Sequence, residues 1–483
     1  MNRSVIRFIL GNILKIEGIL MALPCIIALI YGEKEGFSYL IVGLISTILG
    51  LIITSKKPKE FIIYLKDGCI ATSLSWILMS IVGALPFVLT REIPSFTDAL
   101  FETISGFTTT GASILSDVEA LSFCSLTWRS FTHWIGGMGV LVFLIAIIPL
   151  SGGFNINLMR AESPGPSVGK LVPKVRYTAR LLYIIYFGMT LIEFLLLILG
   201  KMSAFDAMNT AFGTAGTGGF GIKNSSIGEY SNYIQWIVTI FMILFGVNFN
   251  AYYLMIFGKL RKALCIEEVR CYFIIICSSV FIICFNIIDT CKNIGEAFRL
   301  ASFQVASIIT TTGFSTTDYE LWPQASKTIL VLLMFIGACA GSTGGGIKVS
   351  RFVILVKTMF KELASYIHPR SVKKIKIDGK PVEHEVIRST NVYMITFVLI
   401  FALSVLLISF EEKDLTTNFT AVAATINNIG PGLELVGPTQ NFGHFSAFSK
   451  YVLMFDMLAG RLELFPLMLL FHPTVWKEFL YKK

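Results

Sequence analysis

Long runs of apolar residues separated by short polar segments make up most of the chain. A helix needs about 20 predominantly apolar residues to cross a bilayer. Ten stretches approach that length, at residues 8–31, 37–54, 68–90, 126–150, 178–200, 232–257, 270–290, 326–358 (with an interruption), 389–410 and 447–472. The pattern therefore predicts an all-α integral membrane protein with ten transmembrane helices and both termini on one side.

A shorter pattern repeats four times between these stretches. In each copy a segment too brief to span leads into a turn that contains glycine, and a full-length stretch follows. The copies read FTDALFETISGFTTTGAS (96–113), AFDAMNTAFGTAGTGGFG (204–221), GEAFRLASFQVASIITTTGFS (295–315) and FTAVAATINNIGPG (419–432), and they align at Gly111, Gly219, Gly313 and Gly430. The repeat predicts four re-entrant half-helix pore loops in fourfold pseudo-symmetry around one axis.

The glycine turns have the properties of a cation-binding site. Non-helical backbone is tolerated at membrane depth only where it lines an aqueous path or is buried in protein. Turns arranged around an axis present a ring of carbonyl oxygens, which can replace the hydration shell of a cation about the size of potassium. Glycine adopts the positive φ that such turns need, and the preceding half-helices aim the negative ends of their dipoles at the cavity. An ordinary helix C-cap is the alternative for a single copy, but four copies favour a pore.

Composition and charge exclude soluble and nucleic-acid-binding classes of protein. Of 483 residues, 54% are hydrophobic and only 15% are charged, which does not describe a soluble protein. The net charge of +9 comes from basic residues in the short segments between apolar runs, so we expect helix orientation and no nucleic-acid binding. Basic loops at 56–59, 160–180, 259–262 and 357–388 predict cytoplasmic N and C termini and an acidic outer face. The nine cysteines have no CxxC or metal-ligand spacing and are interpreted as packing residues.

Other polar or glycine-rich positions receive structural interpretations. Asp98 and Asp206 lie near the starts of the first two half-helices, where negative charge stabilises a helix and caps free N–H groups. Attraction of cations is a secondary role for these two residues. The GGMG run at 136–139 is expected to allow close helix packing, and His133 is expected to be structural.

Several motifs together resemble the Trk/Ktr/HKT superfamily of potassium transporters. They are FTTTGAS, TGGFG, TTTGFST and NNIGPG in the turns, WRSFTHWIGGMG (128–139), MRAESPGP (159–166), GACAGSTGGGIKVSR (337–351) and AGRLELFP (459–466). The extra N-terminal pair of spans and RAESPGP point to the bacterial Trk type, its membrane-embedded subunit. The resemblance covers nearly the whole chain.

The resemblance implies a potassium site in the turns, because carbonyls just before each filter glycine coordinate potassium in that superfamily. Position by position, the implied filter is Thr109, Thr110, Gly111, Thr217, Gly218, Gly219, Thr311, Thr312, Gly313, Asn428, Ile429 and Gly430. The second copy departs from the pattern in Gly218, and the fourth in Ile429 and Pro431, so a less symmetric filter is expected. Glycine at all four aligned positions goes with potassium more than with sodium in this superfamily.

Two features below the filter suggest a gate. GACAGSTGGGIK interrupts the eighth stretch with five glycines, which at about 1 kcal/mol of lost helix propensity each favour an unwound intramembrane loop over close helix packing. Arg461 lies inside the last stretch, where a charge normally faces a cavity, although an ion pair with Asp456 or Glu463 is the alternative. The predicted gate is Gly341, Ser342, Thr343, Gly344, Gly345, Gly346, Lys348 and Arg461.

These features divide the chain into five units. Residues 1–66 are an N-terminal pair of transmembrane helices, 67–176 and 177–262 are pore repeats 1 and 2, 263–388 is pore repeat 3 with the gate loop and a basic cytoplasmic loop, and 389–483 is pore repeat 4. The resemblance implies a homodimer docked on a cytosolic nucleotide-binding (TrkA-like) ring. Potassium is the transported ion, membrane lipid is the surrounding partner, and no tightly bound cofactor is expected.

The resulting hypothesis is potassium uptake across the bacterial inner membrane, driven by the membrane potential and gated from the cytoplasm. Strict symport with protons or sodium is the first alternative, with Glu193 in the fifth span as the main relay candidate. The potassium-binding subunit of a transport ATPase and a membrane-embedded enzyme are further alternatives. HExxH, GxSxG and paired intramembrane aspartates do not occur in the sequence, so the protein is not expected to be an enzyme.

Overall fold

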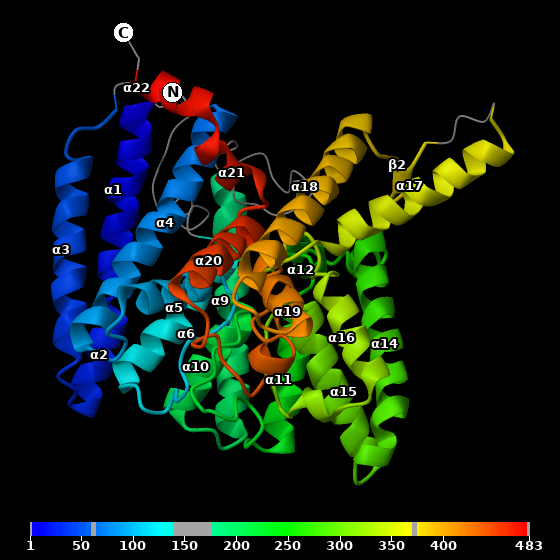
Figure 1. Ribbon diagram of the computed structural model, residues 1–483, viewed down its shortest axis with the longest axis horizontal. Coiled ribbons are helices and arrows are strands. Elements are labelled where there is room, and N and C mark those ends of the chain that lie inside the picture. The colour runs from blue at the N-terminus through cyan, green and yellow to red at the C-terminus, as the bar shows by residue number, and fades with distance from the viewer. Residues whose placement is uncertain (1, 59–63, 140–174, 370–373, 481–483) are drawn as a thin grey trace.

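The computed structural model describes residues 2–58, 64–139, 175–369 and 374–480. These residues form a bundle of helices joined by short loops (Figure 1). The start of α1 and the end of α22 lie at the same end of the bundle (Figure 1). The motif at 159–166 and the second half of the predicted 126–150 span lie outside the described residues.

The N-terminal part consists of four helices that pack closely. They are α1 (Arg3–Leu20), α2 (Ala22–Tyr31), α3 (Gly36–Thr54) and α4 (Leu65–Thr90). Glycines let the backbones of α1 and α3 come into contact. A Cβ built on Gly18 would lie 2.5 Å from the carbonyl oxygen of Gly43, and one on Gly50 would lie 2.6 Å from that of Gly11. Small residues permit this close approach where lipid supplies no hydrophobic driving force.

Four short helices precede the glycine turns, and each is too short to cross a bilayer. They are α5 (Phe96–Phe107), α10 (Ala204–Ala215), α15 (Ile294–Ile309) and α19 (Leu415–Ile426). Each begins with a side-chain cap, from Ser95, Ser203, Asn293 and Asp414 respectively. The capping role expected of Asp98 and Asp206 was wrong, because the serine three residues earlier accepts the bond. Asp98 pairs with Lys450 (2.7 Å), and Asp206 accepts a hydrogen bond from Tyr230 (3.0 Å).

Each short helix packs between two neighbouring helices. α5 lies between α4 and α6 (Phe123–Met138), α10 between α9 (Val175–Leu199) and α11 (Asn232–Phe245), α15 between α14 (Glu267–Ile287) and α16 (Gln324–Met334), and α19 between α18 (His384–Ser409) and α20 (Ala447–Arg461). Contacts between these units run in a circle, through α6 and α10, α11 and α15, α16 and α19, and α20 and α5. The units that the repeated sequence predicts therefore surround a common centre.

Six segments of the described chain are long and apolar enough to cross a membrane. They are Arg3–Tyr31, Gly36–Thr54, Leu65–Thr90, Ala179–Leu199, Glu267–Thr290 and His384–Ser409. The 326–358 stretch is interrupted between α16 and α17 (Val349–Ile367), as its glycines predict. The 447–472 stretch divides after α20 into α21 (Phe465–Met468) and a 3-10 turn at Leu469–Phe471, and α22 (Pro473–Leu480) follows.

Burial follows the pattern of a membrane protein. Large apolar side chains are exposed on the outside of the bundle, for example Leu29, Leu199, Phe281 and Leu399. Many threonines, serines and asparagines of the short helices and turns are instead fully buried at the centre. An apolar exterior of this extent needs hydrocarbon around it.

Two local features differ from the expected pattern. The 232–257 stretch is bent by 92° between α11 and α12 (Phe249–Ile256), where Gly246 ends one helix and the Asn248 side chain caps the next. α13 (Leu260–Leu264) follows. The basic 357–388 loop is not purely irregular, because β1 (Lys376–Ile377) and β2 (Lys380–Pro381) pair antiparallel. The connecting Asp378 and Gly379 have φ of 50° and 76°, the conformation that an Asp-Gly hairpin turn favours.

The α1–α3 contact leads to a stability prediction. Gly18→Ala should lower the melting temperature of the detergent-solubilised protein, because the added methyl group enters a packed contact at a typical cost of about 1–3 kcal/mol. Gly188 on α9 has nothing within 4 Å of an added Cβ, so Gly188→Ala should leave stability unchanged or raise it by up to about 1 kcal/mol through helix propensity. Equal shifts in the two melting curves would contradict the packing.

Candidate functional site

The four short helices end in the same way. After α5 the N–H of Thr109 donates to the carbonyl of Gly106 (3.1 Å), and the N–H of Thr110 donates to that of Ser105 (2.9 Å). The same pair of bonds follows the other three helices, made by Thr217 and Gly218, Thr311 and Thr312, and Asn428 and Ile429. This is the Schellman arrangement of a helix C-terminus. The expected alternative, a C-cap, is therefore present, but the aligned glycine is not the capping residue.

The residue that caps each helix adopts an unusual backbone conformation. Thr109, Thr217 and Thr311 have φ of 56°, 53° and 57°, and Asn428 has φ of 55°. A β-branched residue in the left-handed region is an outlier that costs roughly 1–2 kcal/mol. Two residues later the aligned glycines return to positive φ, between 76° and 98°. Along the three residues of each turn φ is therefore positive, then negative, then positive, so the turn does not continue the helix that precedes it.

The four turns contact one another in a closed order. A Cβ built on any of the aligned glycines would lie less than 3.0 Å from a carbonyl oxygen of a neighbouring turn, too close for a real side chain. The pairs are Gly111 with Gly218, Gly219 with Thr312, Gly313 with Ile429, and Gly430 with Thr110. The turns at 109–111, 217–219, 311–313 and 428–430 thus form a ring, called the four-turn ring below. All residues of the predicted filter meet in it.

Side chains behind the ring connect its turns. The Asn428 side chain donates to the Thr110 hydroxyl and to the Met457 carbonyl, each at 2.9 Å. The His133 ring bonds the Gly106 carbonyl (2.7 Å) through Nδ1, and its Nε2 accepts the N–H of Phe220 (3.2 Å). His133 therefore joins the end of α5 to the residue that follows the second turn, which is the structural role that we expect. The GGMG run also packs closely, since a Cβ on Gly136 would collide with the Phe107 carbonyl.

Sequence reasoning missed a buried ion pair beside the ring. Arg129 pairs with Glu102 at 2.7 Å, and both side chains are almost completely buried. The Glu102 carboxylate accepts bonds from the Ser113 hydroxyl and the Ile114 N–H (both 3.0 Å), while Arg129 donates to the Gly221 carbonyl (3.2 Å). The pair therefore fixes the chain that leaves the first and second turns. One signal was present in the sequence, namely a glutamate in a short apolar helix and an arginine in the next helix. Charges buried in such helices are costly unless they form an ion pair.

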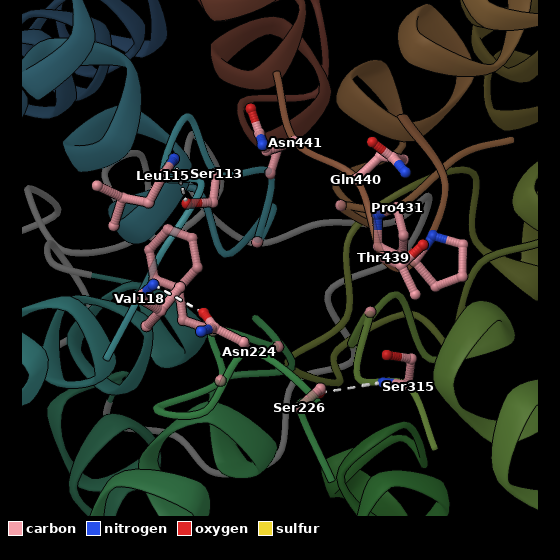
Figure 2. Close-up of a pocket in the computed structure, with 18 of the residues that line it drawn as sticks. Ser113, Leu115, Val118, Asn224, Ser226, Ser315, Pro431, Thr439, Gln440 and Asn441 are labelled. Atoms are coloured by element: carbon pink, nitrogen blue, oxygen red, sulfur yellow. Dashed lines mark hydrogen bonds between the residues drawn. The ribbon is translucent and has the colours of Figure 1, made fainter. Parts of the chain in front are cut away.

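A polar pocket of about 160 Å³ opens on one side of the ring. Figure 2 shows its lining side chains around an open centre, and the four aligned glycines and the residues that follow them form its floor and walls. The loops around it are bonded in the same cyclic order as the turns. The bonds run from Val118 N–H to Asn224 (2.8 Å), Ser315 N–H to Ser226 (3.2 Å), Tyr319 hydroxyl to the Gly432 carbonyl (3.0 Å), and Phe442 N–H to the Ser113 carbonyl (2.8 Å).

The opposite side of the ring is covered by residues 337–348, called the glycine-rich segment below. Its Gly345 N–H donates to the Thr311 hydroxyl at 2.7 Å. Lys348 donates to the carbonyls of Gly344 and Gly345. The segment is also bonded to the α11–α12 bend, where Cys339 N–H donates to the Gly246 carbonyl (3.0 Å). The segment lies against the residues that precede the aligned glycines, so it is on the side away from the pocket.

Arg461 reaches the same side of the ring from the end of α20. Its guanidinium donates to the Thr109 hydroxyl (3.3 Å) and to the carbonyls of Thr343 (3.0 Å) and Gly137 (2.8 Å). The two acids considered as its partners have other bonds: Asp456 accepts from Ser404 (2.7 Å), and Glu463 pairs with Arg351. The residues of the predicted gate therefore lie in one region, and Gly344, Gly345 and Arg461 contact the ring directly, while Gly341 lies beside Asn248 of the bend.

Comparison with known proteins identifies a family that matches most of the chain. The family model described as TrkH, cation transport protein, matches residues 35–478. The chain is 35% identical over 470 residues to the Trk system potassium uptake protein TrkH of Salmonella typhimurium, covering 95% of this chain and 96% of the relative. It is 33% identical to the Trk system potassium uptake protein TrkG of Escherichia coli K12, covering 99% and 100%.

A solved structure is similar as well. The crystal structure of the potassium transporter TrkH from Vibrio parahaemolyticus matches with a TM-score of 0.87 and 32% identity, over 98% of this chain and 99% of that one. A family model that covers most of the chain and relatives of this identity over nearly full length establish membership. The chain belongs to the TrkH family of cation transport proteins.

Proposed function

We propose that this protein takes up potassium through the four-turn ring. The observation that carries the proposal is the closed contact of the turns, in which each aligned glycine faces a carbonyl oxygen of the next turn. Backbone carbonyls around an axis substitute for the water shell of a potassium ion. The relatives named as potassium uptake proteins support potassium as the ion.

The strained threonines support a functional role for the ring. Backbone outliers persist only where the surrounding structure enforces them, and they gather at functional sites. Here Thr109, Thr217 and Thr311 terminate their helices in a conformation that glycine or asparagine would adopt at lower cost. The next residue's carbonyl is thereby held at the contact with the neighbouring turn. The filter is therefore proposed to be Thr109–Gly111, Thr217–Gly219, Thr311–Gly313 and Asn428–Gly430.

The gate is proposed to be the glycine-rich segment with Lys348 and Arg461. These residues cover the ring on the side away from the pocket, and Arg461 carries a permanent positive charge there. A fixed positive charge next to a narrow path raises the barrier for a cation. Ions are thus proposed to enter through the pocket and to leave past this segment when it moves.

We also propose the arrangement of the chain in the membrane and its partners. The helical units that alternate with the four turns fit ten membrane crossings, four pore loops in fourfold pseudo-symmetry and the five units of the sequence. The basic loops favour an orientation with both termini in the cytoplasm. The bacterial relatives support the inner membrane as the location. A homodimer and a cytosolic nucleotide-binding ring are proposed as partners from the family resemblance, with the basic 357–388 loop as the dock.

Selectivity should depend on Gly313. Gly313→Ser places a side chain at φ of 86° and against the Ile429 carbonyl oxygen, so it should lower discrimination of potassium over sodium about tenfold, equivalent to roughly 1.4 kcal/mol. Gly32→Ser is the matched control, because Gly32 has φ of 72° and nothing within 4 Å. Uptake of both ions into liposomes, normalised to folded protein, measures the ratio. A ratio that stays at the wild-type value in Gly313→Ser would remove this turn from the filter.

Flux should depend on the charge of Arg461. Arg461→Ala should raise potassium flux per folded molecule several-fold, because the electrostatic barrier falls. Arg461→Lys keeps the charge and loses the forked hydrogen bonds, so its flux should stay closer to wild type. If both variants express poorly or lose flux together, Arg461 supports the structure and is not a barrier.

The basic loop should contribute to partner binding. Lys374→Gln with Lys376→Gln should weaken co-purification of the nucleotide-binding partner, most strongly at low salt, because raised salt screens the exposed charges of the wild-type protein as well. Arg370 and Lys373 of the same basic cluster lie outside the described residues. Lys34→Gln with Lys292→Gln removes two exposed charges from loops of the opposite parity and serves as control. Undiminished co-purification of the first variant would argue that this cluster is not the dock.

A further inference from the structure

We propose that Glu268, in the first turn of α14, is the positioning residue that holds the glycine-rich segment against the ring. The inference rests on the proposed function, since it assigns the contact that keeps the proposed gate closed. Glu268 was not among the residues that the sequence pattern singled out. It does not touch the ring itself, so its action passes through the segment.

One carboxylate oxygen of Glu268 accepts two backbone hydrogen bonds, one from the glycine-rich segment and one from the start of α17. Its Oε1 accepts the N–H of Ala340 at 2.6 Å and the N–H of Ser350 at 3.1 Å. Ala340 lies inside the glycine-rich segment, and Ser350 lies in the first turn of α17. A single acceptor therefore fixes the distance between the segment and the helix that follows it.

The second oxygen connects the same group to the α11–α12 bend. The Asn248 side chain donates to Oε2 at 3.4 Å. The bend and the segment are bonded directly as well, because the Phe249 N–H donates to the Gly341 carbonyl at 3.0 Å. Glu268 thus lies where the bend, the segment and α17 meet.

The local backbone makes this contact important. Gly341 and Gly346 have φ of 69° and 64°, and the residues between α16 and α17 form no helix of their own. The segment has no regular hydrogen-bond ladder, so side-chain acceptors supplement the few backbone bonds that hold it. Bonds from N–H groups to a carboxylate are stronger than neutral ones. Glu268 is only 7% exposed, so water does not readily replace it.

The neighbouring residue faces the cytoplasmic loop. Glu267 pairs with Lys357 of α17, and its N–H donates to the Asp378 carboxylate at the hairpin turn (2.7 Å). Lys357 also donates to the Lys376 carbonyl of β1 at 2.7 Å. Adjacent residues of α14 therefore contact the hairpin and the segment. A displacement of the β1–β2 hairpin would therefore shift the start of α14, and with it the contact between Glu268 and the glycine-rich segment.

The test combines flux with the reactivity of a native cysteine. Glu268→Ala removes all three bonds, and Glu268→Gln keeps the side-chain size but loses one acceptor oxygen and the charge. Glu17→Gln is the matched control, because Glu17 is a buried carboxylate on α1. Cys339, fully buried in the segment beside Ala340, reports its position through labelling with a water-soluble maleimide, read by mass spectrometry.

In Glu268→Ala we expect potassium flux without partner to rise about tenfold, the effect of losing a charge-assisted bond, with an unchanged potassium-to-sodium ratio. Cys339 should become reactive in this variant, to a lesser extent in Glu268→Gln, and stay protected in wild type and Glu17→Gln. Folded Glu268 variants with protected Cys339, or with an altered ion ratio, would overturn the inference. Cys339 labelling needs no transport, so it decides this point even if liposomes show no potassium flux and the proposed function fails.

Discussion

Four backbone turns meet around one centre, and the space between them admits no side chain. At each contact a carbonyl oxygen of one turn lies against the glycine of the turn before it, so glycine is required there both for its positive φ and for its size. The helices are arranged to satisfy this constraint. Each short helix ends at the ring, two neighbouring helices enclose it, and neighbouring units touch in the same cyclic order as the turns.

Backbone of this kind has no helical ladder to hold it, so buried polar side chains supply the support. The Glu102–Arg129 pair fixes the chain beyond the first two turns, and His133 and Asn428 connect adjacent turns. Burying an ion pair is expensive unless its remaining donors and acceptors are bonded, and here they are bonded to the loops that form the pocket. On the other side, Arg461 and the glycine-rich segment use the hydroxyls of Thr109 and Thr311 as acceptors, so both are bonded directly to the ring.

Much of the ring could be predicted from the sequence because its requirements are local. The four glycines, the short helices before them and the broken span at 337–348 each leave a pattern within about twenty residues, the scale of one membrane helix. Contacts across the chain leave no such pattern. The partners of Glu102 and Arg129 and the bonds of Glu268 depend on which helices become neighbours. The 92° bend and the Asp378-Gly379 hairpin were missed although Gly246, Asn248 and the Asp-Gly dipeptide are local signals, because the long apolar run and the charge of the loop outweighed them.

The central claim is that the ring binds a dehydrated potassium ion through backbone carbonyls. The most direct measurement is anomalous diffraction from crystals of this protein grown with rubidium in place of potassium, since rubidium is close in size and scatters strongly. The account predicts an anomalous peak on the axis of the four-turn ring, within reach of the carbonyls of Thr110, Gly218, Thr312 and Ile429, that weakens when excess potassium is added and is unchanged by the same excess of sodium. A peak elsewhere in the molecule with none in the ring, or an equal loss of the peak with either added ion, would contradict it.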